Sequence, residues 1–141
     1  MYSLYVSAFA LAFALNLVWE NAHMHLYKNF NGDSSPLSRF LRSLYDSFMD
    51  AVLILSLFLV PALLLQLPME WPFTAEIAEH VLLATLGGVV ATIIEWRALR
   101  TGRWQYTEKM PLVPILKVGL SPVVQLMVLP SAIASLTSLL A

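Results

Sequence analysis

The sequence contains no cysteine and few charged residues, and both shortages limit what the protein can do. Without cysteine, disulfides, thiolate nucleophiles and cysteine-ligated metals are excluded. Charged residues make up 12% of the 141-residue chain, about half of the roughly 25% that soluble domains carry. The net charge is −1, whereas nucleic-acid binding needs clustered cations on a soluble face. No nucleic-acid partner is therefore expected, and little of the surface is suited to water.

Apolar residues make up 59% of the chain and gather in long runs. A membrane-spanning helix needs about 20 mostly apolar residues. The runs predict four spans, at about 2–26, 47–67, 74–99 and 112–139. The first run has neither a basic beginning nor a small-residue cleavage site, so we expect a retained helix and not a signal peptide. The length allows one domain, and we predict an all-α membrane protein whose residues 1–141 form a four-helix transmembrane bundle.

A polar stretch with helical periodicity precedes the second span. Ser35 and Pro36 form a good helix start, with serine as the N-cap and proline at the first helical position. Apolar residues recur at helical spacing from position 37 to 48, with Arg39 and Arg42 between them. The pattern predicts a short amphipathic interfacial helix, which either stops before the second span or runs straight into it.

The ends of the last two spans carry their own signals. Thr74 is predicted to cap the start of the third span, and Gly102 to stop it. The fourth span contains Pro114, Pro122 and Pro130, each of which removes a backbone hydrogen bond and bends a helix. Such a helix either lines a cavity or simply curves around the bundle.

The basic residues are distributed unevenly over these spans. All of them fall in or beside the first and third loops: Lys28, Arg39, Arg42, Arg97, Arg100, Arg103, Lys109 and Lys117. The positive-inside rule then places these two loops in the cytoplasm and both termini outside. We expect a multi-pass protein of the cell membrane, such as a bacterial inner membrane.

The same arrangement brings acidic residues to one depth. Glu20 ends the first span, Asp46 and Asp50 begin the second, and Glu95 ends the third; Lys117 is predicted to reach this layer from the fourth. Ionisable groups at membrane depth usually face a bundle interior or a water-filled cavity, and a carboxyl kept neutral there can act as a general acid. The alternative is that these groups mark the interface and pair with nearby arginines.

One face of the first helix carries Asn16, Glu20 and His23, since i+3 and i+4 neighbours align. Glu20 and His23 form a Glu-x-x-His pair of the kind found in di-iron bundles, which need a second such pair and two more carboxylates. The only other Glu/His set lies near His80, at the opposite end of a span. We therefore predict neither metal nor cofactor. The catalytic candidates are Glu20, His23, Asp50 and Glu95.

The third loop and the spans beside it supply candidate substrate-binding residues. Aromatic residues there suit the headgroup belt, and arginine can hold phosphate bidentately. The segment either recognises a lipid diphosphate or phospholipid head group or anchors the protein to anionic lipid. Gln125 lies inside the fourth span, where it bonds a carbonyl freed by Pro122 or lines a cavity. The candidates are Asn16, Trp19, Trp96, Arg100, Arg103, Trp104, Tyr106 and Gln125.

The segment Asn16-Leu-Val-Trp19-Glu20 resembles the Asn-x-x-Trp-Glu motif of the membrane-integral terpene cyclases of fungal meroterpenoid pathways. The resemblance implies that Glu20 donates a proton to an isoprenoid, assisted by an acidic residue of another helix. That family has more spans than this chain, so the likeness is confined to the motif, and a homo-oligomer would be needed to approach its helix number. Gly102-Arg-Trp-x-Tyr with Met110-Pro also looks like small bacterial four-helix membrane proteins, a likeness that implies no function.

Three functions fit these patterns. The first is a membrane-embedded enzyme, such as a cyclase or isomerase, that uses carboxyl groups to move protons on an isoprenoid or other lipid at the cytoplasmic side. The second is a structural or assembly subunit, in which Gly87 and Gly88 permit close helix packing. The third is a small transporter or channel. The expected partners are membrane lipids and a lipid-like substrate, and the chain acts either alone or as a homo-oligomer.

Overall fold

Four long helices account for most of the chain. The computed structural model describes residues 2–30, 35–74 and 76–141. The long helices are α1 (Tyr2–His23), α2 (Pro36–Leu65), α3 (Ile77–Arg100) and α4 (Leu120–Leu139). Short 3-10 turns form η1 (Met24–Leu26), η2 (Lys28–Phe30) and η3 (Trp71–Phe73). All four long helices are apolar and long enough to cross a membrane, which confirms the predicted all-α fold with four candidate spans.

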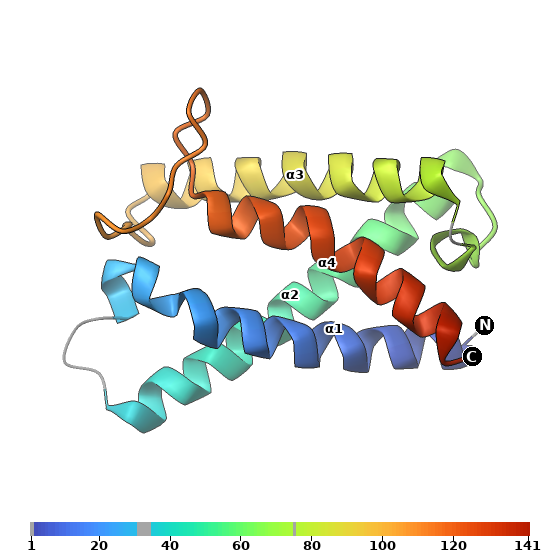
Figure 1. Ribbon diagram of the computed structural model, residues 1–141, viewed down its shortest axis with the longest axis horizontal. Coiled ribbons are helices and arrows are strands. Elements are labelled where there is room, and N and C mark those ends of the chain that lie inside the picture. Colours follow the sequence, from blue (N-terminus) through green and yellow to red (C-terminus); the bar gives the residue numbers. More distant parts are fainter. Residues whose placement is uncertain (1, 31–34, 75) are drawn as a thin grey trace.

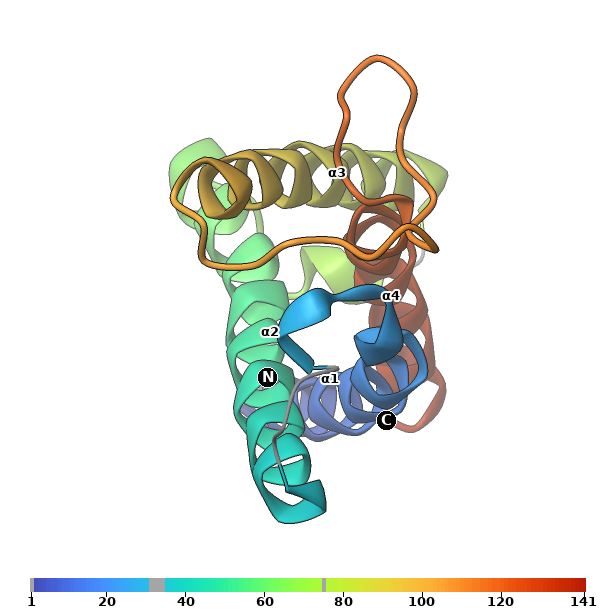
Figure 2. The ribbon, with the colours of Figure 1, turned by 90° about the vertical axis from the view of Figure 1, so that its left-hand side faces the viewer.

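The helices pack as two pairs, and the two pairs contact each other through α1 and α4. α1 lies against α2, α3 lies against α4, and α1 also packs on α4. Both chain ends lie at one end of the bundle, and the segments that follow α1 and α3 meet at the other (Figure 1). α2 crosses the bundle obliquely, so it approaches α3 near their short connection and diverges from it toward the opposite end (Figures 1 and 2). This divergence positions the site described below.

The amphipathic stretch before the second span is the first part of α2 and not a separate helix. Ser35 caps the helix, and its side chain accepts a hydrogen bond from the Ser38 amide at 3.2 Å. Pro36 is the first helical residue, as predicted, and costs no backbone bond there. The helix then continues unbroken through 30 residues, so polar residues of its first turns and apolar residues of its span share one rigid element.

The start of α3 differs from the prediction. Thr74 does not cap the helix, which begins at Ile77 with Glu76 as its N-cap. The Glu76 amide donates to Oε2 of Glu79 at 3.1 Å, and a carboxylate at this position satisfies an amide that the helix leaves unpaired. Thr74 instead donates its hydroxyl hydrogen to the same carboxylate.

The end of α3 follows the predicted glycine stop. Gly102 has a φ of 66°, a left-handed conformation that costs glycine little. Its amide donates to the Leu99 carbonyl at 3.3 Å, and the Arg103 amide donates to the Ala98 carbonyl at 2.9 Å. This pair of bonds is the Schellman arrangement, and it turns the third loop back over the end of the helix.

The predicted fourth span begins eight residues too early, because residues 112–119 form a turn that projects from the bundle (Figure 1). The Val113 amide donates to the Val118 carbonyl at 2.8 Å, and the Leu120 amide donates to the Pro111 carbonyl at 2.7 Å. Pro111 and Pro114 have no amide hydrogen with which to continue a helix through this segment.

Two predictions change with the shorter helix. Lys117 lies exposed in the turn with a φ of 57°, so it does not reach the carboxyl layer. Pro122 sits in the first turn of α4, where no intrahelical amide bond is lost, and only Pro130 lies in the helix interior.

Candidate active site

A cavity of about 360 Å³ lies at the loop end of the bundle, where α2 and α3 diverge. Its walls come from all four long helices and from both loops, and they combine carboxyl, aromatic and aliphatic side chains. The lining residues are Glu20, His23, Tyr27, Arg42, Tyr45, Asp46, Met49, Asp50, Leu53, Ala91, Ile94, Glu95, Arg103, Trp104, Pro122, Gln125 and Leu126. The four acidic residues predicted to share one depth therefore face a common space.

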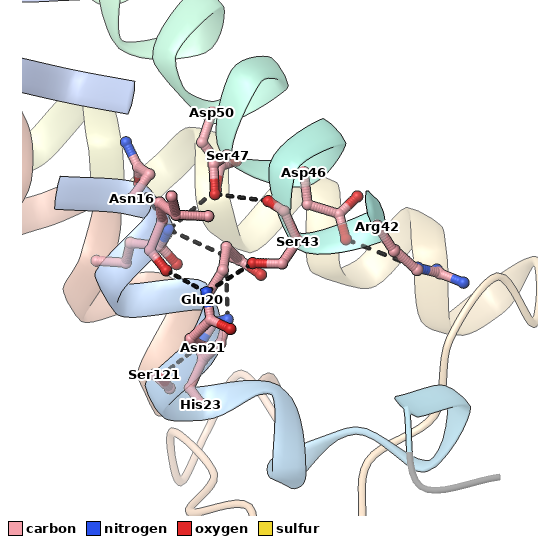
Figure 3. Close-up of polar contacts among 12 residues, drawn as sticks. Asn16, Glu20, Asn21, His23, Arg42, Ser43, Asp46, Ser47, Asp50 and Ser121 are labelled. Carbon is pink, nitrogen blue, oxygen red and sulfur yellow. Dashed lines mark hydrogen bonds and ion pairs between the residues drawn. The ribbon is translucent and has the colours of Figure 1, made fainter. Parts of the chain in front are cut away.

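Gln125 of α4 joins polar groups of α1 and α2 at the wall of this cavity. Its Nε2 lies 2.8 Å from Oδ1 of Asn16, 2.9 Å from Oδ2 of Asp50 and 3.3 Å from Oε1 of Glu20. Asn16 is fully buried and donates its own amide hydrogen to the Ala12 carbonyl at 2.7 Å. The side chains of α1 and α2 point toward one another across the helix pair (Figure 3). One neutral amide thus supplies donors to acceptors from two other helices.

His23 links the same network to the first turn of α4. Its Nε2 lies 3.1 Å from Oε1 of Glu20, and its Nδ1 lies 2.8 Å from the Ser121 hydroxyl (Figure 3). The Glu-x-x-His spacing therefore serves a hydrogen-bonded acid–imidazole pair. Among the residues that the structure describes, no three histidine or acidic side chains are grouped as metal ligands.

Glu95 is held from the opposite side by the third loop. The side chain is 3% exposed, and its Oε2 accepts hydrogen bonds from the Trp104 indole at 3.2 Å and from the Tyr106 hydroxyl. The Tyr106 oxygen in turn accepts from the Gly119 amide at 2.8 Å. Oε2 of Glu95 thus already accepts two hydrogen bonds.

The two loops at this end are joined into a cap. Tyr27 and Tyr106 form an antiparallel bridge, in which the Lys28 amide donates to the Gln105 carbonyl at 2.9 Å. Tyr27 and Met110 are buried in a small aromatic cluster with the rings of Trp104 and Tyr106. In Figure 2 the loops lie across the end of the bundle. The cap therefore covers the loop end of the cavity.

The cavity reaches the outer surface sideways, between α2 and α3. Tyr45 and Met49 of α2 are 58% and 46% exposed, and Ile94 of α3 is 36% exposed, yet all three line the cavity. Both helices are long and apolar enough to cross a membrane, so this apolar opening would face lipid in a bilayer. We refer to Tyr45, Met49 and Ile94 as the lateral mouth.

The hydroxyl of Tyr106 is expected to stay protonated in alkaline solution. Burial raises its pKa, and the hydrogen bond to Glu95 raises it further. Because the pKa of Tyr106 is higher in the folded than in the unfolded chain, the hydroxyl contributes fully to the free energy of unfolding below about pH 10. This contribution is lost as the pH rises toward the pKa that Tyr106 has in the folded protein. In an absorbance titration, Tyr106→Phe should therefore match the wild type at about pH 11. A missing tyrosinate signal in the variant at that pH would contradict this assignment.

The remaining predicted binding residues lie outside the cavity lining. Trp19 packs on the apolar core, Trp96 donates its indole hydrogen to the Leu116 carbonyl at 2.8 Å, and Arg100 is exposed at the end of α3. Asn16 and Tyr106 do not line the cavity, but each contacts a residue that does: Asn16 accepts from Gln125, and Tyr106 donates to Glu95. Trp19 and Trp96 thus contact the core and the projecting turn, and Arg100 lies on the surface.

Several lining residues were not among the sequence candidates. Tyr27 lies in a loop, and the neighbours of such a residue depend on the tertiary fold. Ser121, the partner of His23 at the start of α4, lies outside the lining and was missed for the same reason. Arg42 and Asp46 of α2 were also not among the candidates, although they recur with Asp50 every four residues on one face. That stripe is visible in the sequence, but nothing there distinguishes it from the other faces of the helix.

Comparisons with protein families, with curated proteins and with solved structures find no match to this chain. A function therefore has to be argued from the cavity itself.

Proposed function

We propose that the protein is a membrane-embedded enzyme that moves protons on an unsaturated isoprenoid or other lipid. The observation that carries the proposal is the cavity, in which Glu20, Asp50 and Glu95 from three helices face one space that opens between α2 and α3. A purely structural bundle has no need of ionisable groups around a cavity, since they are costly at membrane depth.

The placement of the carboxyl groups suits a pair of proton transfers. Glu20 of α1 is the expected acid, and Glu95 of α3 is the expected base. Because Oε2 of Glu95 already accepts two hydrogen bonds, Oε1 is the oxygen that would take the proton. Donation of a proton to one carbon of a double bond leaves a cation on the other carbon, and removal of a proton from the next carbon restores a double bond in a shifted position. If a second double bond of the substrate first attacks that cation, its π electrons form the new carbon–carbon bond of a ring, and loss of a proton beside the new cation completes the reaction. The two transfers balance, so the reaction consumes no reductant, oxidant or cofactor.

Aromatic rings of the lining support the same chemistry. Tyr27, Tyr45 and Trp104 border the cavity, and the face of an aromatic ring attracts positive charge. Charge that develops on a protonated double bond would thus meet ring faces and carboxylates. Apolar residues at the inner end, among them Leu53 and Leu126, are suited to the hydrocarbon part of the substrate.

Deuterium incorporation tests the proposal even while the exact substrate is unidentified. The purified protein is incubated in heavy water with a total lipid extract supplemented with unsaturated isoprenoid alcohols, and carbon-bound deuterium is measured by mass spectrometry. We expect incorporation with the wild type and its loss in both Glu20→Gln and Glu95→Gln, because an amide cannot exchange the proton that a carboxyl donates or accepts.

The matched control is Glu108→Gln, which changes an exposed carboxyl outside the cavity and should retain full incorporation. Circular dichroism and gel filtration establish that each variant is folded. Incorporation at the wild-type rate in both cavity variants would rule the proposal out.

A further inference from the structure

The lining of the cavity changes in character from its loop end inward. Along one face of α2, Arg42, Asp46, Asp50 and Leu53 follow one another at helical spacing. At 1.5 Å per residue, the distance from the first to the last of them is roughly 16 Å. The cavity lining is therefore basic at the rim, acidic in the middle and apolar at the inner end. An extended amphiphile with an anionic head and an apolar chain would match this order.

Two guanidinium groups converge on the rim from different elements. Nε of Arg42 lies 3.7 Å from Oδ2 of Asp46, and Arg103 is within electrostatic range of the same carboxyl. The Arg103 guanidinium carbon lies 5.5 Å from the centroid of the Trp104 ring. The rim therefore carries two cations and one carboxylate.

The deeper carboxyl groups have other partners. Glu20 is paired with His23, Asp50 accepts from Gln125, and Glu95 accepts from the third loop. An anionic group at the rim would accordingly be drawn to the arginines, which offer paired donors that match phosphate oxygens.

We propose that the cavity binds a lipid phosphate, with its phosphate between Arg42 and Arg103 and its chain inserted through the lateral mouth between α2 and α3. This names the substrate class of the enzyme proposed above and rests on the same cavity. The functional group that reacts would lie in the first part of the chain, at the level of the carboxyl groups.

Equilibrium binding to the protein in a neutral maltoside detergent tests the proposal. The probes are decyl phosphate, decanol, decyltrimethylammonium and inorganic phosphate, so that chain and charge are separated. Decyl phosphate should bind about tenfold or more tightly than decanol, since hydrogen bonds to charged groups are worth that much. Inorganic phosphate, which has no chain, should not displace it at equal concentration.

Arginine variants locate the phosphate. Arg42→Gln and Arg103→Gln should each weaken the binding of decyl phosphate about tenfold and leave decanol unchanged. Arg39→Gln and Arg100→Gln are matched controls, because they remove exposed cations near the same two helix ends but outside the cavity. Equal losses in the controls, or tighter binding of decyltrimethylammonium than of decyl phosphate, would overturn the proposal.

Adjacent isoleucines test the route of the chain. Ile94→Trp places a large ring in the lateral mouth and should weaken the binding of both decyl phosphate and decanol, whereas Ile93→Trp changes an exposed neighbour outside the lining and should not. Equal binding by the two variants would contradict access between α2 and α3.

The binding assay is independent of turnover. Glu20→Gln should keep the affinity for decyl phosphate within about threefold of the wild type while it abolishes deuterium incorporation. If decyl phosphate binds no more tightly than decanol while deuterium is still incorporated, only the proposal of a lipid phosphate is rejected. If decyl phosphate is preferred but no lipid mixture incorporates deuterium, only the proposal of an enzyme is rejected.

Discussion

Gly87→Ala is expected to disrupt the packing of α3 on α4, because no space exists for a single added methyl group. A Cβ at position 87 would lie 1.8 Å from the Leu126 carbonyl oxygen and 2.6 Å from its carbon. Both atoms belong to the backbone of the facing helix, so the clash is relieved only if the helices separate. Overpacking typically costs about 1–3 kcal/mol, and we expect a loss at the upper end of that range or beyond it.

The next residue supplies a matched control. A Cβ at Gly88 would meet only the flexible Met127 side chain, at 3.2 Å and 3.3 Å. Alanine is favoured over glycine inside a helix by roughly 0.5–1 kcal/mol, so Gly88→Ala should be neutral or stabilising. Thermal unfolding in detergent, followed by tryptophan fluorescence and gel filtration, compares the two variants. Equal stabilities would show that the close approach at Gly87 is not required.

This contact also bears on the idea that the glycine pair recruits another subunit. Gly87 is buried against α4 of its own chain, so the small-residue surface that permits close packing is already used within the bundle. Gly87 is therefore not available to another subunit.

Local regularities in the sequence were enough to predict the four helices and much of the acidic layer. The apolar content of a span is a property of its own residues and does not depend on which helices pack against it. The four spans were therefore recognisable from the sequence alone. Likewise, Asn16, Glu20 and His23 share a face because of helical geometry, and all three are buried. These features depend on residues a few positions apart.

The start of α4 was mispredicted because apolar content does not distinguish a helix from an apolar turn. Leu112, Val113, Ile115 and Leu116 extend the hydrophobic run, yet they belong to the projecting turn. The informative signal was the proline pattern. The pair Ser121-Pro122 lies within two residues of the true start, and the same Ser-Pro signal correctly located the start of α2.

The hydrogen-bond partners of the carboxyl groups were beyond the reach of sequence reasoning. Trp104 and Tyr106 were expected at the headgroup belt or against the substrate, but the reversal at Gly102 returns them to Glu95. Gln125 meets Asn16 across 109 positions of the chain. No periodicity links such distant residues, and only the packing of the helices brings them together.

The second large effect is expected for Gln125→Leu, which removes the only donor group that joins α4 to both α1 and α2 in the described part of this network. Oxygens of Asn16, Glu20 and Asp50 would lose the amide hydrogens that they accept. A buried acceptor without a donor costs about 1–3 kcal/mol, and more if it is charged. We expect a loss of roughly 2–4 kcal/mol in the free energy of unfolding, measured as for the glycine variants.

A double variant separates the lost donor from altered packing. Leucine matches glutamine closely in size, so packing alone predicts a small effect for Gln125→Leu and an additional loss when Asp50→Leu is combined with it. The hydrogen-bond account predicts the opposite: removal of a stranded carboxyl restores part of the stability, because replacement of both partners by apolar groups is nearly neutral. A double variant less stable than Gln125→Leu alone would refute that account. A double variant more stable than Gln125→Leu alone would support it, and one more stable than the wild type would show that the polar centre of the bundle costs stability.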